Sequence, residues 1–505
     1  MSDVRATFNR LADHYRQVAL LSSIESMLGW DERCLLPSAA GEYRAEQITL
    51  LAGMVHQRLT EPWIGDALGE LAATHRAADP ASDTGASIRQ WKRQYDRKVR
   101  LPQSLVEELT RTSVLGQQVW EKARGDNDFA AFAPLLTKTI ELKRQQADAL
   151  GYSESRYDAL LDDFEPGELT SNVARVLSAL REELVPLVAE IAASDRTADI
   201  SLLRRQYPID KQAALGRDVA ARIGFDFARG RLDTTAHPFC SGMGPHDCRI
   251  TTRYDPSYFN SALFGILHEA GHALYEQGLR PDWYGLPPGE TVSLGIHESQ
   301  SRLWENLVGR SHAFWRHFYP AAQAAFPQSL AAVPLEAFYF AINDVRPSLI
   351  RIEADEATYN LHILLRFELE QDLLNDQLPV GDLPAAWHDK YRQYLGVEPA
   401  NDADGVLQDI HWSAGLVGYF PTYSLGNLYA SQFFAQADRD LGGLDDQFAR
   451  GEFAQLRAWL AENIHSQGQR YTAAQLVERV TGQALSPAPL IAHLRAKLGP
   501  LYGLK

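Results

Sequence analysis

The sequence predicts a mainly α-helical protein that carries one small β-sheet. Apolar residues recur at three- and four-residue spacing along most of the 505 residues, which is the pattern of helices with one buried face. Alternation of β-branched residues, which is typical of strands, is found mainly at 232–256. The sequence shows no internal repeat, no low-complexity tract and no long polar linker. We therefore expect one large helical body rather than a string of domains.

The helices are expected where the apolar period is clearest. Over 3–30, apolar side chains from Phe8 to Ile24 fall on one face of a helix. Pro102 is typical of a helix start, because the first turn leaves unpaired the N–H that proline lacks. A basic run at 89–100 could mark a polyanion site, but its spacing favours the solvated face of a helix. The other segments with a helical period are 169–191, 210–223, 354–374 and 453–464.

The small sheet is expected between these helical segments. Residues 248–254 are β-branched and alternating, which is typical of a short strand. Glycines and prolines at 238–245 precede this segment and predict turns. Residues 291–295, Thr-Val-Ser-Leu-Gly, are interpreted as a further strand. The sheet would then lie beside the helical body.

Composition and charge exclude several classes of protein. The chain has 49 Lys+Arg against 65 Asp+Glu, and its formal net charge of −16 argues against a nucleic-acid or membrane surface. No apolar run reaches the roughly 18 residues that span a bilayer, and the N-terminal segment lacks the apolar region of a signal peptide. Three cysteines cannot form a disulfide framework, so we expect free thiols in a reducing compartment. A cytoplasmic protein is the resulting prediction.

A metal-binding motif lies in the helix predicted over 255–278, which opens with an Asp-Pro pair and ends at a glycine. His268 and His272 are one helical turn apart on one face, so both imidazoles can reach one ion. Glu269 lies about 100° further round the helix, where it can take a proton from water at the ion without being a ligand. Gly271 weakens the helix and is understandable if another element packs closely there. Two structural core histidines are the alternative interpretation.

A catalytic zinc site needs a third protein ligand and an open position. After a connection rich in Gly and Pro at 280–290, a second amphipathic helix opens with His297 and Glu298. Both are candidates, and Glu298 is preferred because adjacent helical residues rarely face the same ion. His297 is then expected to contact the substrate. Glu305, on the same helix, is interpreted as a surface residue or as a support for a ligand.

The sequence resembles the M32 metallocarboxypeptidases, the carboxypeptidase Taq family. The resemblance rests on short motifs that occur in the order of the family and span nearly the whole chain. They are Trp30-Asp31, His237-Pro238-Phe239, Asp247-Cys248-Arg249-Ile250-Thr251, His268 to His272, His297-Glu298-Ser299, Ile350-Arg351-Ile352-Glu353-Ala354-Asp355 and Gly405-Val406-Leu407-Gln408-Asp409-Ile410-His411-Trp412. The motif cores show no departure from the family pattern.

The resemblance implies both a fold and an activity. The fold would be a large helical body similar to gluzincin peptidases, with a deep substrate groove and a small sheet beside the metal-binding helix. The activity would be removal of C-terminal residues from peptides, with broad preference and poor tolerance of proline. By position, His268, His272 and Glu298 match the metal ligands of the family, and Glu269 matches its catalytic glutamate. The metal would be one divalent ion, zinc by default with cobalt as the alternative, and the protein would form a homodimer.

The chemistry of a carboxypeptidase points to four further residues. The oxyanion of the reaction needs hydrogen-bond donors, and His411 and Tyr423 are candidates, although both could equally be buried aromatics with satisfied polar atoms. The substrate carboxylate needs a cation, and a guanidinium binds a carboxylate bidentately. Arg351 is preferred for this role, with Arg249 as a second anchor. A structural ion pair, for instance between Arg351 and Asp355, is the alternative.

The sequence leaves two other functions open. One is a helical metallo-oligopeptidase that cuts internal peptide bonds. The other, a non-catalytic scaffold stabilised by metal, is disfavoured because a structural site does not need Glu269 and usually fills all four positions with protein ligands. Since motifs from 237 to 423 must converge on one ion, the chain is expected to be a single catalytic domain over 1–505. Its parts would be N-terminal helices at about 1–230, a metal-site core at about 231–425 and C-terminal helices at about 426–505.

Overall fold

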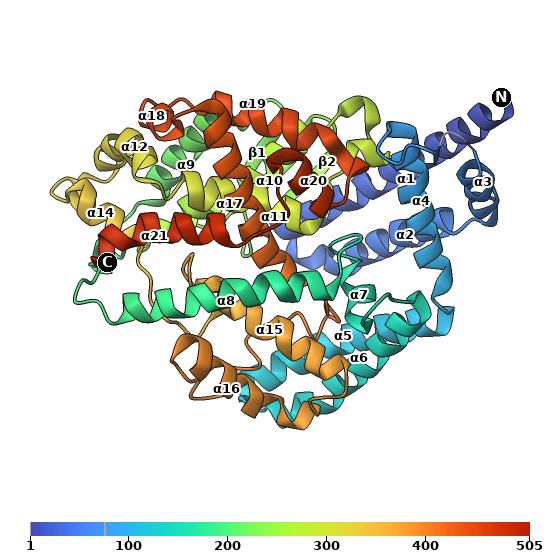
Figure 1. Cartoon of the computed structure of the whole chain (residues 1–505), viewed down its shortest axis with the longest axis horizontal. Helices are drawn as coiled ribbons and strands as arrows, with labels where there is room; N and C mark the ends of the chain where they lie inside the picture. The colour runs from blue at the N-terminus through green and yellow to red at the C-terminus, as the bar shows by residue number, and fades with distance from the viewer. Residues whose placement is uncertain (1, 75–76, 505) are drawn as a thin grey trace.

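Helices make up most of the molecule, as the sequence predicts (Figure 1). The structure is a computed structural model and describes residues 2–74 and 77–504. The N-terminus and the C-terminus lie at opposite ends of the long axis in Figure 1. Helices α8 (Thr170–Ala192) and α21 (Ala488–Tyr502) pack together across the middle of the molecule. The expectation of a mainly α-helical fold with one small sheet is confirmed.

The helices that precede the sheet agree well with the predicted segments. The segment predicted at 3–30 is α1, and the segment opened by Pro102 is α5, which has Pro102 at its N-cap. Their bounds are α1 (Ser2–Cys34), α2 (Gly41–Leu59), α3 (Pro62–Ala72), α4 (Asp83–Arg100), α5 (Gln103–Asp126), α6 (Phe129–Leu150), α7 (Arg156–Leu161), α8 as above and α9 (Ile209–Ile223).

The helices that follow the sheet carry most of the chemical motifs. Helix α11 continues directly into a π-helical segment, η6 (Leu303–Val308). The bounds of the helices are α10 (Phe259–Gly278), α11 (Leu294–Arg302), α12 (His312–Ala325), α13 (Pro327–Leu330), α14 (Leu335–Ile342), α15 (Tyr359–Leu374), α16 (Leu383–Leu395), α17 (Pro421–Leu441), α18 (Leu444–Ala449), α19 (Ala454–Asn463) and α20 (Ala473–Thr481), followed by α21.

The sheet has three strands in the order β1-β3-β2. Strand β3 (Asp247–Thr252) is central; it pairs in parallel with β1 (Gly230–Thr234) and antiparallel with β2 (Cys240–Gly244). Helix α10 packs against β3, whose side chains from Ile250 to Thr252 are buried. The strand predicted at 248–254 is therefore present, and the sheet lies beside the predicted metal-binding helix.

One predicted strand and two predicted helix starts are wrong, and the first two cases below have a local reason. Residues 291–295 form no strand, because the Ser293 side chain accepts a hydrogen bond from the Ile296 backbone and caps α11. Helix α10 begins at Phe259 rather than at the Asp-Pro pair, since the Asp255 carboxylate accepts hydrogen bonds within a turn at Ser257. The helix predicted from 354 begins only at Tyr359.

The basic run at 89–100 lies on a helix, α4, as predicted, but its charges are not simply solvated. Arg93 and Arg97 form ion pairs with Asp162, and Arg97 also pairs with Asp163. The opposite face of α4 buries Ile88 and Trp91 in a small apolar cluster with α1 and α3. Ion pairs of the basic run therefore connect α4 to Asp162 and Asp163, which follow α7. Across the described part of the chain, no helix combines the length and apolarity needed to cross a membrane.

Candidate metal centre

Two adjacent helices bring three candidate metal ligands together. His268 and His272 lie on α10, and Glu298 lies on α11, which packs against α10. The Nε2 atoms of His268 and His272 lie 3.7 and 3.5 Å from Oε2 of Glu298. The three ligand atoms all fall within 4.8 Å of one another. These separations are long for hydrogen bonds but suit donors arranged around one ion.

Glycines allow the helices around Glu298 to approach closely. A Cβ atom at Gly271 would lie 2.5 Å from the backbone oxygen of Gln300 and 2.6 Å from Cα of Ser301. The element expected to pack against Gly271 is therefore α11. A Cβ atom at Gly426, on α17, would lie 2.6 Å from Cγ of Glu298. The Glu298 side chain is thus confined between α10 and α17.

A carboxylate and a guanidinium hold the ligands from the outer side. Glu305 accepts a hydrogen bond from His268 Nδ1 at 2.9 Å, which leaves Nε2 of the same ring facing the other ligands. Arg302 donates to Glu298 Oε1 at 2.8 Å and to Glu305 Oε2 at 3.1 Å. Glu305 belongs to the π-helical segment η6, and π-helical turns are frequent at functional sites. The interpretation of Glu305 as a support for a ligand agrees with this geometry.

His297 lies beside the three ligands but not among them. Its Nε2 lies 2.9 Å from Glu276 Oε1, which accepts the hydrogen bond. Its ring stacks on that of His272 with the centroids 4.5 Å apart. Among the described residues, the side-chain positions therefore group Glu298, and not His297, with His268 and His272 as a set that could hold a metal ion.

Burial and neighbouring charges shift the pKa values in this cluster. Burial raises the pKa of Glu269 to about 7, and the charge of Glu298 adds to this shift. Burial would lower the pKa of His268, but the charge of Glu298 and the hydrogen bond to Glu305 together outweigh it, and the pKa rises to about 9. Burial lowers the pKa of His272 to about 3, so this imidazole is neutral at pH 7. Glu298 has a pKa well below its ordinary value because Arg302 and His268 overcome the effect of burial.

This donor set fits a divalent cation. Two imidazole nitrogens and a carboxylate oxygen form a typical catalytic zinc site, which keeps its fourth position for water or substrate. His272 is neutral and Glu298 is ionised, so both have electron pairs for a cation. A bound cation would replace the proton that the carboxylates attract to His268. The residues present therefore fit a metal ion without rearrangement of the helices that carry them.

Arg351, the residue expected to bind the substrate carboxylate, is buried in an ion-pair network. Its Nε and Nη2 donate to Asp409 Oδ1 at 3.0 and 2.8 Å. Arg366 donates to the other oxygen of Asp409 at 2.7 Å. Arg351 Nη1 donates to the hydroxyl of Tyr359 at 3.0 Å. Asp355 instead accepts hydrogen bonds within its own turn, so the structural partner of Arg351 is Asp409 rather than Asp355.

His411 and Tyr423 form a pair against the same arginine. His411 Nε2 lies 3.3 Å from the Tyr423 hydroxyl, and the guanidinium carbon of Arg351 lies 5.2 Å from the Tyr423 ring centroid. Burial lowers the pKa of His411 to about 4 and raises that of Tyr423, so both side chains are neutral at pH 7. Tyr423 lies on α17, which packs against α11 and its Glu298. The two candidate donors, His411 and Tyr423, therefore lie next to Arg351.

Arg249 lies on the central strand and belongs to a different cluster. It donates to both oxygens of Asp247 at 2.9 Å, and its guanidinium lies 4.3 Å above the ring centroid of Trp30. The backbone N–H of Phe239 donates to the Thr251 hydroxyl at 2.8 Å. Three of the motifs noted in the sequence therefore meet around β3.

Sequence reasoning missed three residues that build this region. Arg302 stands four residues after Glu298, a spacing that could have indicated an ion pair on one helix face. Arg366 and Glu276 carry no such signal, because their partners Asp409 and His297 lie 43 and 21 residues away in the chain.

Two histidines one turn apart, a glutamate between them and a carboxylate from a second helix define the site of a metallopeptidase. Comparison with known families agrees, because residues 10–498 match the family described as carboxypeptidase Taq (M32) metallopeptidase. The chain belongs to this family.

Relatives share the whole length of the chain. It is 46% identical to thermostable carboxypeptidase 1 of Thermus thermophilus over 99% of each chain, and 37% identical to carboxypeptidase 1 of Bacillus subtilis over 97% of each. The fold matches the crystal structure of the M32 carboxypeptidase from Deinococcus radiodurans with a TM-score of 0.95 at 41% identity, covering 99% of this chain and 100% of that one. The chain is therefore a metallocarboxypeptidase, which uses a divalent metal ion and acts on peptides.

Proposed function

We propose that the chain releases C-terminal residues from peptides of broad sequence, with one zinc ion held by His268, His272 and Glu298. The observation that carries this proposal is the set of three ligand atoms within 4.8 Å of one another, supported from behind by Glu305. Two nitrogen ligands and one carboxylate oxygen favour zinc, with cobalt as the alternative.

Glu269 is proposed as the general base. When bound, the metal ion would polarise the scissile carbonyl and make water at the site more acidic. The Glu269 side chain is buried next to His268, and its pKa of about 7 lies in the range where a group both takes up and releases a proton at neutral pH. We propose that Glu269 accepts the proton of the attacking water and passes it to the leaving amine.

Arg351 is proposed to bind the terminal carboxylate of the substrate. Asp409 is shared by Arg351 and Arg366, so one carboxylate faces two guanidinium groups. A net positive charge therefore remains in this buried network and favours an anionic ligand. Arg249, on the separate β3 cluster, is proposed as a second anchor in the groove.

His411 and Tyr423 are proposed to stabilise the oxyanion that forms during hydrolysis. Both are neutral at pH 7, so the Tyr423 hydroxyl and an imidazole N–H are available as donors. Their contact with each other and with Arg351 would hold these donors in position. His297, stacked on His272, is proposed to contact the substrate next to the metal.

We further propose that the chain acts as one catalytic domain over 1–505, as a homodimer in the cytoplasm. The family resemblance supports the dimer. The ligands, Arg351 and Tyr423 come from widely separated parts of the chain, which supports one interdependent unit. The three free cysteines, Cys34, Cys240 and Cys248, support a reducing compartment.

Peptides that differ only at the C-terminus test the site of cleavage. A peptide with a free C-terminal carboxylate should lose its residues one by one, and the same peptide ending in an amide should resist, because Arg351 then has no anion to bind. Mass spectrometry of the products distinguishes the outcomes. Equal cleavage of the amide would favour the metallo-oligopeptidase instead, and no cleavage of either peptide by the metal-loaded protein would favour a non-catalytic scaffold.

A further inference from the structure

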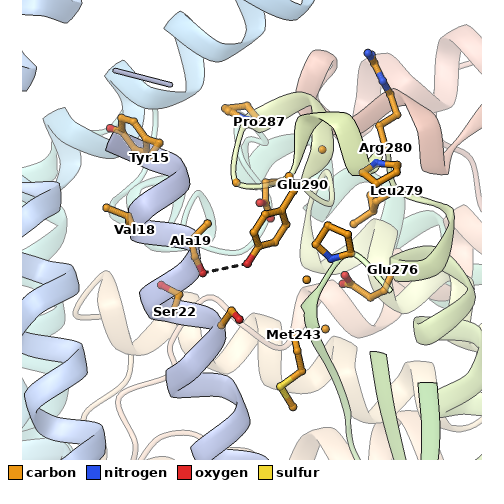
Figure 2. Close-up of a pocket in the computed structure, with 18 of the residues that line it drawn as sticks. Tyr15, Val18, Ala19, Ser22, Met243, Glu276, Leu279, Arg280, Pro287 and Glu290 are labelled. Carbon is orange, nitrogen blue, oxygen red and sulfur yellow. Dashed lines mark hydrogen bonds between the residues drawn. The ribbon is translucent and has the colours of Figure 1, made fainter. Parts of the chain in front are cut away.

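A cavity of about 360 Å³ lies at the C-terminal end of α10, the helix that carries His268 and His272, and Figure 2 shows side chains that line it. It is bounded by α1, by β2 and by the segment that follows α10, and this segment includes the short turns η4 (Pro281–Trp283) and η5 (Pro287–Gly289). Tyr284 closes one side by donating a hydrogen bond to the backbone oxygen of Ala19 on α1 at 3.1 Å. The cavity is built from segments far apart in the chain, and the mechanism proposed above does not use it.

Glu276 connects this cavity to the metal ligands. It lies on α10, one turn beyond His272, and its carboxylate lines the cavity. The same carboxylate accepts the hydrogen bond from His297, whose ring stacks on His272. A Cβ atom at Gly242, on β2, would lie 2.7 Å from Oε2 of Glu276. The glycine thus leaves room for the carboxylate at the cavity wall.

A second carboxylate, that of Glu290, also lines the cavity (Figure 2). Glu290 accepts a hydrogen bond from the Gly285 backbone, and burial together with the charge of Glu276 raises its pKa to about 7. Within residues 2–74 and 77–504, Glu276 pairs only with His297, and Glu290 forms no ion pair. Two carboxylates that line one cavity without a lysine or arginine partner create a local negative potential.

The arginines that also line the cavity do not cancel this charge. Arg280 pairs with Asp83 at 3.0 Å, and in Figure 2 its side chain extends away from Glu276 and Glu290. Arg229 pairs with Asp226 at 2.9 Å. Each guanidinium is therefore already neutralised by an aspartate.

The metal centre lies between this cavity and the Arg351 network. At the start of α11, His297 contacts Glu276 of the cavity. At the end of α11, Arg302 covers the ring of Tyr359, whose hydroxyl accepts a hydrogen bond from Arg351. Glu298 stands between these two ends. A peptide anchored by its carboxylate at Arg351 would therefore run past the metal ligands toward the cavity.

We propose that the cavity binds a positively charged group of the peptide substrate on the N-terminal side of the scissile bond. The group is an ammonium or guanidinium, supplied by the free N-terminus of a short peptide or by a lysine or arginine side chain. It would sit between Glu276 and Glu290 and complement the binding of the carboxylate at the opposite end. This inference rests on the proposed function, because it assumes that the substrate carboxylate lies at Arg351.

Peptides with a common C-terminal sequence test the cavity and distinguish the two sources of charge. One series has a free or acetylated N-terminus at lengths of two to six residues, and the other is acetylated with lysine or norleucine at each position upstream of the cleaved bond. We expect kcat/KM to be about tenfold higher for a charged peptide than for its neutral partner at one length or position. Equal kcat/KM throughout both series would overturn the inference while leaving the carboxypeptidase activity intact. No cleavage of any peptide would instead reject the proposed function.

A variant pair assigns the preference to the cavity. Glu290→Gln should reduce the ratio of kcat/KM for charged over neutral peptides from about tenfold to near one. Glu478→Gln, which removes an exposed carboxylate on α20, should leave the ratio unchanged. An unaltered ratio in folded Glu290→Gln would overturn the assignment. The peptide series on the wild-type protein tests the inference even if this variant does not fold.

Discussion

Two buried clusters of charged side chains differ in how tightly they are closed. In the metal centre, the histidine nitrogens stay 3.5 and 3.7 Å from Glu298 Oε2, and the shorter bonds lie on the outer side, from Glu305 and Arg302. In the second cluster, Arg351 and Arg366 lie 2.8 and 2.6 Å from the oxygens of Asp409. The metal centre is therefore an open cluster whose inner side can accept an ion, whereas the second is a closed cluster in which two guanidiniums share Asp409 and keep a net positive charge.

The contrast predicts that metal removal abolishes activity without unfolding the protein. Dialysis against a chelator should eliminate release of C-terminal residues, because the open cluster supplies no other electrophile. Added zinc should restore activity and raise the melting temperature, since a ligand that binds only the native state stabilises it. Peptide release, metal content and thermal unfolding measured on the same sample check this. Full activity in a sample shown to be metal-free would contradict the assignment of the centre.

Glu269→Gln should reduce kcat by about a thousandfold, which is within the range for loss of a general acid–base group. Glutamine keeps the shape of the side chain but cannot accept the proton. Because Glu269 is not among the three ligand atoms, the variant should still bind one equivalent of metal. Initial rates on a blocked dipeptide and metal analysis of the purified variant separate these effects. Retention of wild-type activity would rule out the role of Glu269.

Much of the open cluster could be predicted from the sequence, because several of its residues lie close together in the chain. His268, Glu269 and His272 are fixed relative to one another by one helix, and the glycine between them indicated a close neighbour. The neighbour itself, α11, could not be identified from spacing. Glu305 was interpreted as a surface residue or as a support for a ligand, but spacing could not show that it holds His268, 37 residues away. The preference for Glu298 over His297 was a prediction about helix faces, and the positions of both side chains agree with it.

The closed cluster was much less predictable. The sequence favoured Arg351 as the anchor of the substrate carboxylate and offered a pair with Asp355, at a helical spacing of four residues, only as the alternative. That segment is not helical beyond the short turn at Arg351–Glu353, so Asp355 points elsewhere and the partner comes from 58 residues away. The wrong strand at 291–295 has a similar origin, because a serine cap overrode β propensity.

Asp409→Asn tests the closed cluster and should lower the free energy of unfolding by about 3 to 5 kcal/mol, because it leaves two buried guanidiniums without an anion. Burial would raise the pKa of Asp409, but Arg366 and Arg351 outweigh it and hold the pKa well below its ordinary value. The stabilisation is therefore present above the unfolded pKa of about 3.9 and is lost as pH falls through the folded pKa.

Urea unfolding of wild type and Asp409→Asn between pH 7 and pH 3 checks this prediction. The difference in stability should stay constant down to about pH 5 and shrink toward pH 3. Asp389→Asn is the matched control, since its partner Arg392 is an exposed arginine and the change should be under about 1 kcal/mol. A difference that grew on acidification would contradict the depressed pKa.

The smallest predicted effect concerns the outer side of the open cluster. Glu305→Gln should weaken zinc binding by about 10- to 100-fold. Glutamine orients the His268 ring less firmly, and it places no negative charge next to the ring. Competition with a chromogenic chelator measures the affinity directly, and activity at saturating zinc should recover more than activity at limiting zinc. Glu336→Gln provides the control, since Glu336 also contacts a histidine, His312, at 3.0 Å but on the exposed surface. If both variants bound zinc as tightly as wild type, the positions of the three ligands alone would determine the affinity for zinc. The hydrogen bond between Glu305 and His268 would then contribute only to the stability of the fold.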